Sequence, residues 1–394
     1  MNEVQEGTTF SPKKWSSTGL LVAVLGFIAL FGGGISTVGW DVTMASYFFG
    51  FVFWLALTIG CIGLQKLHHT VRGSWGLSVL RLWEAGGSVT SFVVFAIAFL
   101  PIAFSLPTVY HHWIGPHAEE LHGGKTVLLT PAFFIARIFI YLAVWAAYAA
   151  YFRNSTVKQD ETGDLKIGTV RNTRGAVSLV VFFLINTLFI TDLVMSLDPH
   201  WFSTILGVWS AVSMGLGALS FAAFILLRYR NEEPWSRVIT PKLTKDIGNM
   251  LFVLTMLWCY TTLSQYLIIW SGNMPEFNRF YLARDGWWNI LGGVNIFLGF
   301  FVPWMLLLSP RVKANYSTLL RVTILIFVVR IIDWYWNIIP YFRQTPAWTD
   351  AAAWIAFAGL WFFAFGRTAA QAPLLVSHDR RLEEMKQMEV AHGH

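Results

Sequence analysis

Residues 43–64, TMASYFFGFVFWLALTIGCIGL, contain no charged side chain. An α-helix needs about 20 mostly apolar residues to cross the hydrocarbon core of a bilayer. This stretch therefore predicts a transmembrane helix. The rest of the chain has the same character, because 55% of its residues are hydrophobic and only 13% are charged. A soluble domain carries about 25% charged residues, so the composition excludes a soluble enzyme.

Ten stretches are long and apolar enough to cross a membrane, and we predict an all-α integral membrane protein of about ten transmembrane helices. The weakest of them are the ninth, which contains charged residues, and the tenth, which is rich in Ala and Trp. The predicted spans are approximately 17–38, 43–64, 86–107, 131–152, 176–197, 204–228, 247–271, 286–309, 317–339 and 350–372.

The basic residues predict the orientation of these helices. With the N-terminus in the cytoplasm, 22 of the 28 Lys and Arg fall on the cytoplasmic side and 4 on the opposite side, while Arg137 and Arg330 fall within spans. Cytoplasmic loops are enriched in Lys and Arg. We therefore predict that both termini are cytoplasmic. The same bias explains the net charge of +6 without a nucleic-acid partner.

A weak internal repeat relates spans two to five to spans six to nine. Asp192 and Pro199 are seven residues apart, as are Asp333 and Pro340, and Arg137 aligns near Asn295. This predicts two four-helix bundles flanked by the first and tenth helices, although chance alignment of apolar sequence is the alternative. The predicted units are a tail (1–16), the first helix (17–42), bundles at 43–203 and 204–349, the tenth helix (350–372) and a solvated cytoplasmic tail (373–394).

Ligands for redox cofactors are missing from the predicted spans. All ten histidines lie outside them, and Cys61 and Cys259 are too far apart for a CxxC site. A haem in a helical bundle needs axial ligands from the helices, and iron–sulfur clusters need several Cys thiolates. We therefore expect no haem, iron–sulfur cluster or metal to be bound by this chain alone.

Four charged residues inside the spans are candidates for function. A charge at a helix centre costs about 2.5–3.5 kcal/mol on insertion scales, so such residues usually pair or face a wet cavity. We predict contacts between Arg137 and Asp192 and between Arg330 and Asp333 in the outer half of the membrane. These pairs either hold helices together or belong to a polar pocket or proton relay.

Other titratable and polar residues extend these candidates toward both surfaces. His112, Asp198 and His200 fall at the predicted outer surface, where an imidazole can pass protons near neutral pH. On the cytoplasmic side, Glu84 and Asp246 open helices, where capping is the alternative role. The seventh span is unusually polar and includes Tyr260 and Gln265. Its side chains would hold a water chain or hydrogen-bond to neighbouring helices.

Two stretches resemble a known family. They are TDLVMSLDPHWFS at 191–203, and CYTTLSQYLIIWSGNMPE at 259–276 followed by RDGWW at 284–288. Both are similar to the polysulfide-reductase-type (NrfD-like) membrane subunits of alternative complex III, a bacterial quinol:cytochrome c oxidoreductase. The resemblance implies two four-helix bundles and a multi-pass protein of the bacterial plasma membrane.

The resemblance also implies partners and a ligand. The partners would be a homologous NrfD-like C subunit, an iron–sulfur/molybdopterin-like B subunit, haem-c subunits, small membrane anchors and a terminal oxidase, all surrounded by lipid. The haem c and iron–sulfur clusters would belong to these partners. A quinol such as menaquinol would bind at the outer end of a bundle. Candidate pocket residues are His112, Arg137, Asp192, Asp198 and His200; candidates for a proton path are Glu84, Asp246, Tyr260, Gln265, Asp192, Arg330 and Asp333.

Three functions remain open at this point. The first is an electron-transfer subunit that contributes a quinol site, a proton path or both. The second is a non-catalytic scaffold in the same complex. The third is a secondary transporter, which predicts helices interrupted by Gly or Pro near the midplane.

Overall fold

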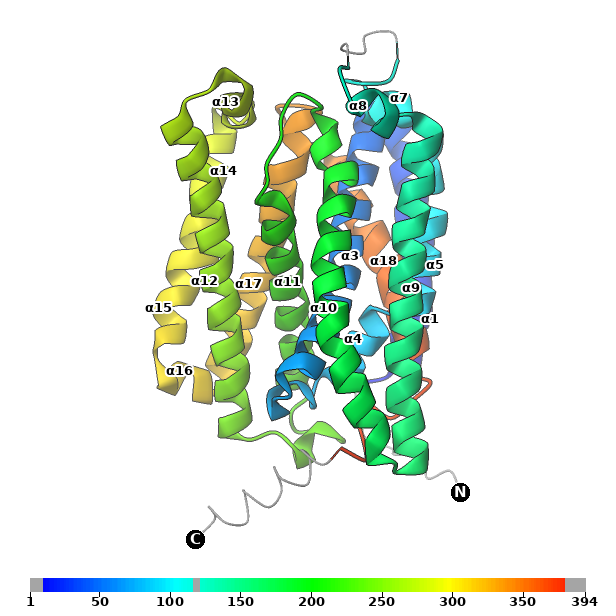
Figure 1. Cartoon of the computed structure of the whole chain (residues 1–394), viewed down its shortest axis with the longest axis vertical. Coiled ribbons are helices and arrows are strands. Elements are labelled where there is room, and N and C mark those ends of the chain that lie inside the picture. Colours follow the sequence, from blue (N-terminus) through cyan, green and yellow to red (C-terminus); the bar gives the residue numbers. More distant parts are fainter. Residues whose placement is uncertain (1–9, 116–120, 380–394) are drawn as a thin grey trace.

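The computed structural model describes residues 10–115 and 121–379, and the regular elements within them are all helices. Ten helices of the described chain are long and apolar enough to cross a membrane. The predicted all-α membrane fold is therefore confirmed. Figure 1 shows the long helices side by side, with successive helices running in opposite directions. We call the end at which α1 begins and α18 ends the basic end, and the other the far end.

The ten spans are built from the following elements. The first five contain α1 (Pro12–Ile28), η1 (Ala29–Gly33) and α2 (Gly34–Val38); α3 (Trp40–Val71); α4 (Leu80–Gly86), α5 (Val89–Ala98) and α6 (Leu100–Phe104); α9 (Pro131–Thr162); and α10 (Leu165–Leu193) with η3 (Met195–Leu197). The other five contain α11 (Leu206–Arg228); α12 (Pro241–Gly272); α14 (Trp287–Ile296), η5 (Phe297–Phe301) and α15 (Val302–Leu308); α17 (Tyr316–Ile338) with η6 (Ile339–Tyr341); and α18 (Trp348–Ala369). Short helices connect them: η2 (Ser74–Gly76), α7 (Leu106–Val109), α8 (Lys125–Leu128), η4 (Trp235–Arg237), α13 (Pro275–Leu282) and α16 (Pro310–Ala314).

Several helices extend further at the basic end than their apolar stretches predict. Asp164 caps α10 by accepting a hydrogen bond from the backbone N–H of Lys166 at 2.9 Å, and Thr240 caps α12 in the same way. Such caps satisfy backbone donors that would otherwise be unpaired at a helix start. Polar sequence thus continues the helices beyond the hydrocarbon. Counting apolar residues alone could not locate these ends.

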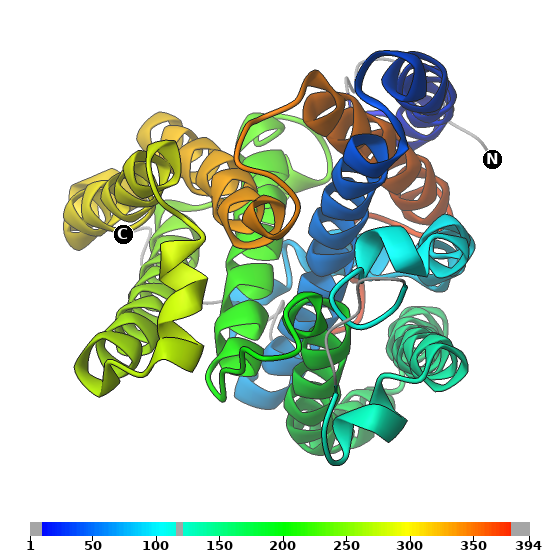
Figure 2. The same ribbon diagram turned by 90° about the horizontal axis from the view of Figure 1, so that it is seen from above.

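The helices pack as two groups around a central pair. α3 contacts α4, α5, α9 and α10, while α11 contacts α12 and α17, and α14 and α15 pack against these two. α3 and α11 also pack against each other, which makes them the most buried spans. Figure 2 shows the two groups on either side of this pair. This grouping matches the predicted bundles, whereas the cytoplasmic placement of the termini remains a prediction.

The first and last spans flank the bundles together, because α1 packs along α18. Their backbones approach closely at glycines. A Cβ atom added to Gly359 would lie 2.3 Å from the backbone nitrogen of Ala23, and one added to Gly19 would lie 2.7 Å from that of Phe363. Small residues permit such close helix contacts in membranes, where packing replaces the hydrophobic effect as the driving force.

The described part of the predicted tail, from residue 373, is exposed at some positions and packed against the helices at others. Val376 is 6% exposed. The backbone N–H of Ser377 donates to Asp160 at 2.9 Å, and the Gln159 amide donates to the carbonyl of His378 at 2.6 Å. These contacts hold residues 374–379 against α9. Charge composition alone does not reveal such hydrogen bonds to a neighbouring helix.

We expect Gly359→Ala to destabilise the protein by about 1–3 kcal/mol, the usual cost of overpacking. The new methyl group would force α1 away from α18. Thermal unfolding of the purified chain in detergent measures this effect. Gly293→Ala is the matched control, since a Cβ atom there meets nothing within 4 Å, and it should be neutral or slightly stabilising through helix propensity. Equal melting temperatures for the two variants would contradict the close contact.

Candidate functional site

A cavity of about 450 Å³ lies within the second bundle. Its walls come from α11, α12, α14, η5 and α17, and α13 contributes at the far end. Most of the lining is apolar and much of it aromatic. Cavities of this size and character are typical small-molecule sites. The aromatic side chains at its wall are Trp201, Trp209, Tyr266, Phe280, Tyr281, Phe300, Phe301 and Trp336.

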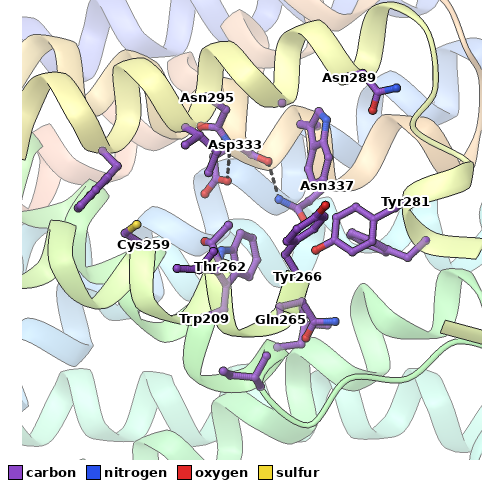
Figure 3. Close-up of a pocket in the computed structure, with 18 of the residues that line it drawn as sticks. Trp209, Cys259, Thr262, Gln265, Tyr266, Tyr281, Asn289, Asn295, Asp333 and Asn337 are labelled. Carbon is purple, nitrogen blue, oxygen red and sulfur yellow. Dashed lines mark hydrogen bonds between the residues drawn. The ribbon is translucent and has the colours of Figure 1, made fainter. Parts of the chain in front are cut away.

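A few polar side chains enter this cavity from three helices. Thr262 and Gln265 come from α12, Asn289 and Asn295 from α14, and Asp333 and Asn337 from α17. Figure 3 shows these groups on opposite walls, with Cys259 beside them. A small number of placed polar groups in an apolar wall gives a site its specificity.

Asp333 is the most connected of these polar groups. Its Oδ2 accepts hydrogen bonds from the Ser213 hydroxyl at 3.0 Å, the Trp258 indole at 3.0 Å and Arg330 at 2.8 Å. Its Oδ1 accepts one from the Asn295 amide at 2.9 Å. These donors belong to α11, α12, α17 and α14, so one carboxylate joins the four spans of the second bundle.

Arg330 supplies the compensating charge. Its side chain is 1% exposed, and its guanidinium carbon lies 4.0 Å from the centre of the Trp258 ring. A Cβ atom added to Gly299 would lie 3.0 Å from its Nη2. Gly299 belongs to the π-helical turn η5, and π-turns in membrane helices often mark functional positions. The predicted contact between Arg330 and Asp333 is confirmed.

The far end of the cavity is covered by the hairpin after α10 and by α13. Trp201 stacks on Phe280 with ring centres 4.5 Å apart, and Arg279 pairs with Asp198 at 2.9 Å. Arg284, fully buried, lies 3.5 Å above the Phe280 ring and donates to the backbone carbonyls of Trp336 and Asn337. Burial lowers the pKa of Arg284, an effect that Tyr341 and Asp198 oppose.

Tyr281 is the titratable group of α13 that faces the cavity. Burial is the main cause that raises the pKa of its phenol above the usual value. The hydroxyl is therefore protonated across the physiological range, and it offers a neutral donor and acceptor at the wall.

The first bundle contains the other predicted ion pair, which is also confirmed. Arg137 donates to both oxygens of Asp192, at 2.8 and 2.9 Å, and the Tyr141 hydroxyl donates to the same carboxylate at 2.8 Å. Asp192 and Asp333 thus each accept a hydrogen bond from the preceding span, from Arg137 in one bundle and Asn295 in the other. This agreement favours the internal repeat over chance alignment.

The remaining far-end candidates lie away from the cavity wall. The rings of His111 and His112 are tilted relative to each other with centres 4.3 Å apart, and the backbone N–H of His200 donates to Asp198 at 3.1 Å. Tyr260 is 65% exposed and faces outward from α12. Of the residues predicted for a pocket or proton path, only Gln265 and Asp333 line the cavity itself. The Ser203 hydroxyl donates to Gln265 from the hairpin.

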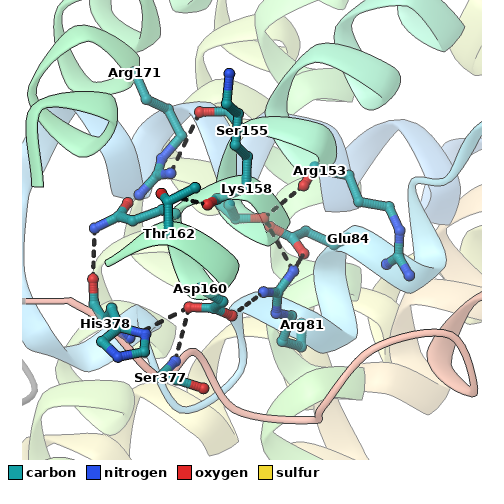
Figure 4. Close-up of polar contacts among 12 residues, drawn as sticks. Arg81, Glu84, Arg153, Ser155, Lys158, Asp160, Thr162, Arg171, Ser377 and His378 are labelled. Atoms are coloured by element: carbon teal, nitrogen blue, oxygen red, sulfur yellow. Dashed lines mark hydrogen bonds and ion pairs between the residues drawn. The ribbon is translucent and has the colours of Figure 1, made fainter. Parts of the chain in front are cut away.

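The two acids at the basic end occupy different surroundings. Glu84 is 1% exposed and forms an ion pair with Arg81 at 2.6 Å. The Thr156 hydroxyl donates to Glu84 at 2.6 Å. Asp160 forms a second ion pair with Arg81. Figure 4 shows this cluster, to which Ser377 is also bonded. Glu84 therefore holds α4 to α9 and caps no helix. Asp246 lies on α12, in the other bundle, and is half-buried.

One sequence-based expectation about histidines is wrong. His68 and His69 belong to the last turns of α3, inside a candidate span, and both are fully buried. The apolar stretch ends at residue 64, but the helix continues to Val71. Adjacent residues on one helix point in different directions, so this pair does not form the two opposed axial ligands of a haem.

Sequence reasoning missed the residues that surround Asp333. Ser213, Trp258 and Trp336 have no distinguishing pattern in an apolar, Trp-rich chain. Asn295 had a signal, since an amide inside an apolar span needs a partner, and the repeat aligned it near Arg137. An amide inside an apolar span is thus the one sequence feature that could have indicated this cavity.

No protein-family model matches the chain, and no curated protein is significantly similar to it. The fold and the cavity define a multi-pass membrane protein with a partly open, apolar site that is rich in aromatic side chains. Such a site suits a flat, apolar molecule that carries polar atoms at its edges, because the rings can stack while the amides and Asp333 bind those atoms.

We expect Asp333→Asn to cost about 3–5 kcal/mol of stability, because it leaves a buried arginine without its counter-charge. Asp192→Asn should cost less, on the order of 1–2 kcal/mol, since the Arg137 side chain is 11% exposed and also donates to the carbonyl of Leu128. Thermal unfolding in detergent measures both.

The double variant Arg330→Met with Asp333→Asn tests whether the unpaired charge of Arg330 causes this loss of stability. Removing both charges should recover much of the loss, giving a positive coupling in the double-mutant cycle. Additive losses would show that Arg330 and Asp333 stabilise the bundle independently.

Proposed function

We propose that this chain is a membrane subunit of a respiratory quinol:cytochrome c oxidoreductase of the alternative complex III type, and that its second bundle contributes a quinol pocket. The observation that supports this most directly is the aromatic cavity with Asp333 at its wall. The two stretches that resemble NrfD-like subunits, at 191–203 and 259–288, both lie beside it, since Trp201, Cys259 and Gln265 line it.

The chemistry of a quinol fits these walls. A quinol has a flat ring with hydroxyl groups at opposite edges and a long apolar tail. Rings such as Trp336 and Phe300 can stack on it. Asp333 Oδ1 accepts one hydrogen bond within the protein, from Asn295, and a carboxylate oxygen can accept two. A quinol hydroxyl would donate to the free position, and Thr262, Gln265 or Tyr281 would hold the second hydroxyl.

Oxidation of the bound quinol would give a quinone, two protons and two electrons. The electrons would pass to haem c or iron–sulfur centres of partner subunits, the class of oxidant that the proposal requires. The first proton would leave along the hydrogen bond to Asp333, because a positioned acceptor lowers the barrier to its transfer. Asp198 and His200 lie beyond the cavity at the far end, where protons would be released.

Two alternatives share this fold. A scaffold subunit would keep the helices but leave the cavity without a quinol. A transporter would need substrate access from both ends. Of the cavity-lining spans, α11, α12 and α17 are continuous, and only the span that contains η5 is irregular. These continuous helices favour the subunit proposal over a transporter, which would be expected to have interrupted helices around its site. Under this proposal, the protein lies in the bacterial plasma membrane and assembles with the partner subunits that the resemblance implies.

Cys259 provides a direct test of quinone binding. It lines the cavity, whereas Cys61, the only other cysteine of the chain, is 1% exposed. We expect a short-chain menaquinone analogue to slow alkylation of Cys259 by N-ethylmaleimide at least fivefold in the purified chain, as measured by mass spectrometry. Thr262→Trp, which fills the cavity, should abolish the quinone effect.

The control is a saturated hydrocarbon of the same tail length, which should protect far less. If the quinone analogue gives no protection at saturating concentration, the cavity is not a quinol site and the scaffold alternative gains.

Turnover by the assembled complex in liposomes tests the role of Asp333. We expect Asp333→Asn to lower quinol:cytochrome c turnover at least tenfold, and Asp192→Asn to change it less than threefold, because only Asp333 reaches the cavity. Samples are compared at equal subunit content and proton release is recorded in parallel. Unchanged rate and proton yield in an assembled Asp333→Asn complex would assign this acid a structural role only.

A further inference from the structure

A second hollow lies far from the cavity, on the outer surface between α9 and α10. Its apolar part, of about 560 Å³, is lined by residues such as Val144, Ala147, Tyr148 and Val177. Its polar part, of about 520 Å³, is lined by Asn154, Ser155, Lys158 and Lys166 among others. Tyr151 and Arg174 line both parts. We call the two together the α9–α10 groove.

The α9–α10 groove crosses the edge of the hydrocarbon layer. α9 has 32 residues, which corresponds to about 48 Å of helix, while the hydrocarbon core is about 30 Å thick. Its sequence is apolar up to Phe152 and polar from Arg153 onward. The apolar part of the groove therefore faces acyl chains, and the polar part lies at the depth of the headgroups.

Three cations gather in the polar part. Arg174, Lys158 and Lys166 are all exposed. Arg174 is positioned by Tyr151, to whose hydroxyl it donates at 3.0 Å. One acid, Asp164, lines the same part, but it accepts the backbone N–H of Lys166 as a helix cap. The groove thus has a net positive charge where phosphate groups lie.

A buried amine lies behind the apolar part. Lys66 is fully buried, and its ammonium nitrogen lies 3.6 Å from the centre of the Tyr148 ring and 5.4 Å from that of Phe182. The nitrogen has no hydrogen-bond partner in the described chain. Tyr148 forms the wall between this buried amine and the groove.

We propose that the α9–α10 groove binds an anionic phospholipid. Its phosphate would contact Arg174, Lys158 and Lys166, and an acyl chain would lie along Val144, Ala147 and Val177. Basic pockets between transmembrane helices at the cytoplasmic side are typical sites for acidic headgroups. The order of apolar and cationic surface along the groove matches that of a phospholipid. A partner's helix could fill the apolar part, but it would not require three cations at one end.

The test uses the full-length chain, purified in neutral detergent and depleted of lipid, with phosphatidylglycerol as the probe. Native mass spectrometry counts the bound lipid. We expect one phosphatidylglycerol to persist, and the triple variant Lys158→Gln, Lys166→Gln and Arg174→Gln to weaken its binding at least tenfold. The matched control neutralises three exposed cations at the same end, Lys14, Lys245 and Arg311, and should retain it.

Further measurements distinguish a lipid phosphate from free phosphate and test whether the acyl chain of the lipid contributes to binding. Phosphatidylcholine and inorganic phosphate should each bind at least tenfold more weakly than phosphatidylglycerol. Ala147→Trp, which fills the apolar part, should also weaken phosphatidylglycerol binding. Because the substituted side chains are exposed, melting temperatures without lipid should match the wild type.

Three outcomes would overturn the proposal. They are equal binding of phosphatidylcholine, full retention of phosphatidylglycerol by the triple variant, and a partner polypeptide seated in the groove of the intact complex in place of lipid. None of these outcomes depends on whether a quinol binds in the second bundle.

Discussion

The carboxylate of Asp333 determines how four helices meet. Apolar helices in a bilayer have no hydrophobic force that selects one mutual rotation over another. A buried polar group does select one, because each donor that turns away from it is left unsatisfied in a medium without water. Ser213, Trp258 and Asn295 each come from a different helix and all reach this carboxylate. The same group forms part of the cavity wall, so support of the bundle and recognition of a ligand depend on one set of hydrogen bonds.

Each bundle contains a buried aspartate whose charge is neutralised by an arginine. The two bundles place that arginine differently, and the cavity lies in the second bundle. In the first bundle, a long arginine from α9 fills the space beside Asp192 and neutralises it directly. In the second, the aligned position holds the shorter Asn295, and the positive charge comes from Arg330 on the same helix as the acid. The guanidinium is packed against Trp258 and over Gly299. The shorter Asn295 lines the cavity of the second bundle together with Asp333.

The sequence was sufficient for the spans, their number and the two ion pairs, because each follows from the cost of placing a polar group in hydrocarbon. It was insufficient where partners come from apolar-looking positions. Trp258 and Trp336 are ordinary residues in a chain with 20 tryptophans, and only their placement gives them a role. The candidates His112, Asp192 and His200 were chosen for their chemistry at the correct depth, yet depth does not reveal which bundle contains the hollow. Helix ends such as that of α3, with His68 and His69, were missed because polar residues can continue a helix past the apolar stretch.

The contact between α1 and α18 joins two spans that lie about 320 residues apart in the chain. Membrane helices enter the bilayer in the order of translation, so the main packing partner of α1 is made about 320 residues after it. At synthesis speeds of 5–20 residues per second, that interval is roughly 15–65 seconds. During it, the glycine face of α1 is exposed to lipid and to any other helix that is nearby. A chain that ends before α18 would keep the aromatic contact of α1 with α3, through Phe27 and Tyr47, but would lack the close packing at glycines between α1 and α18.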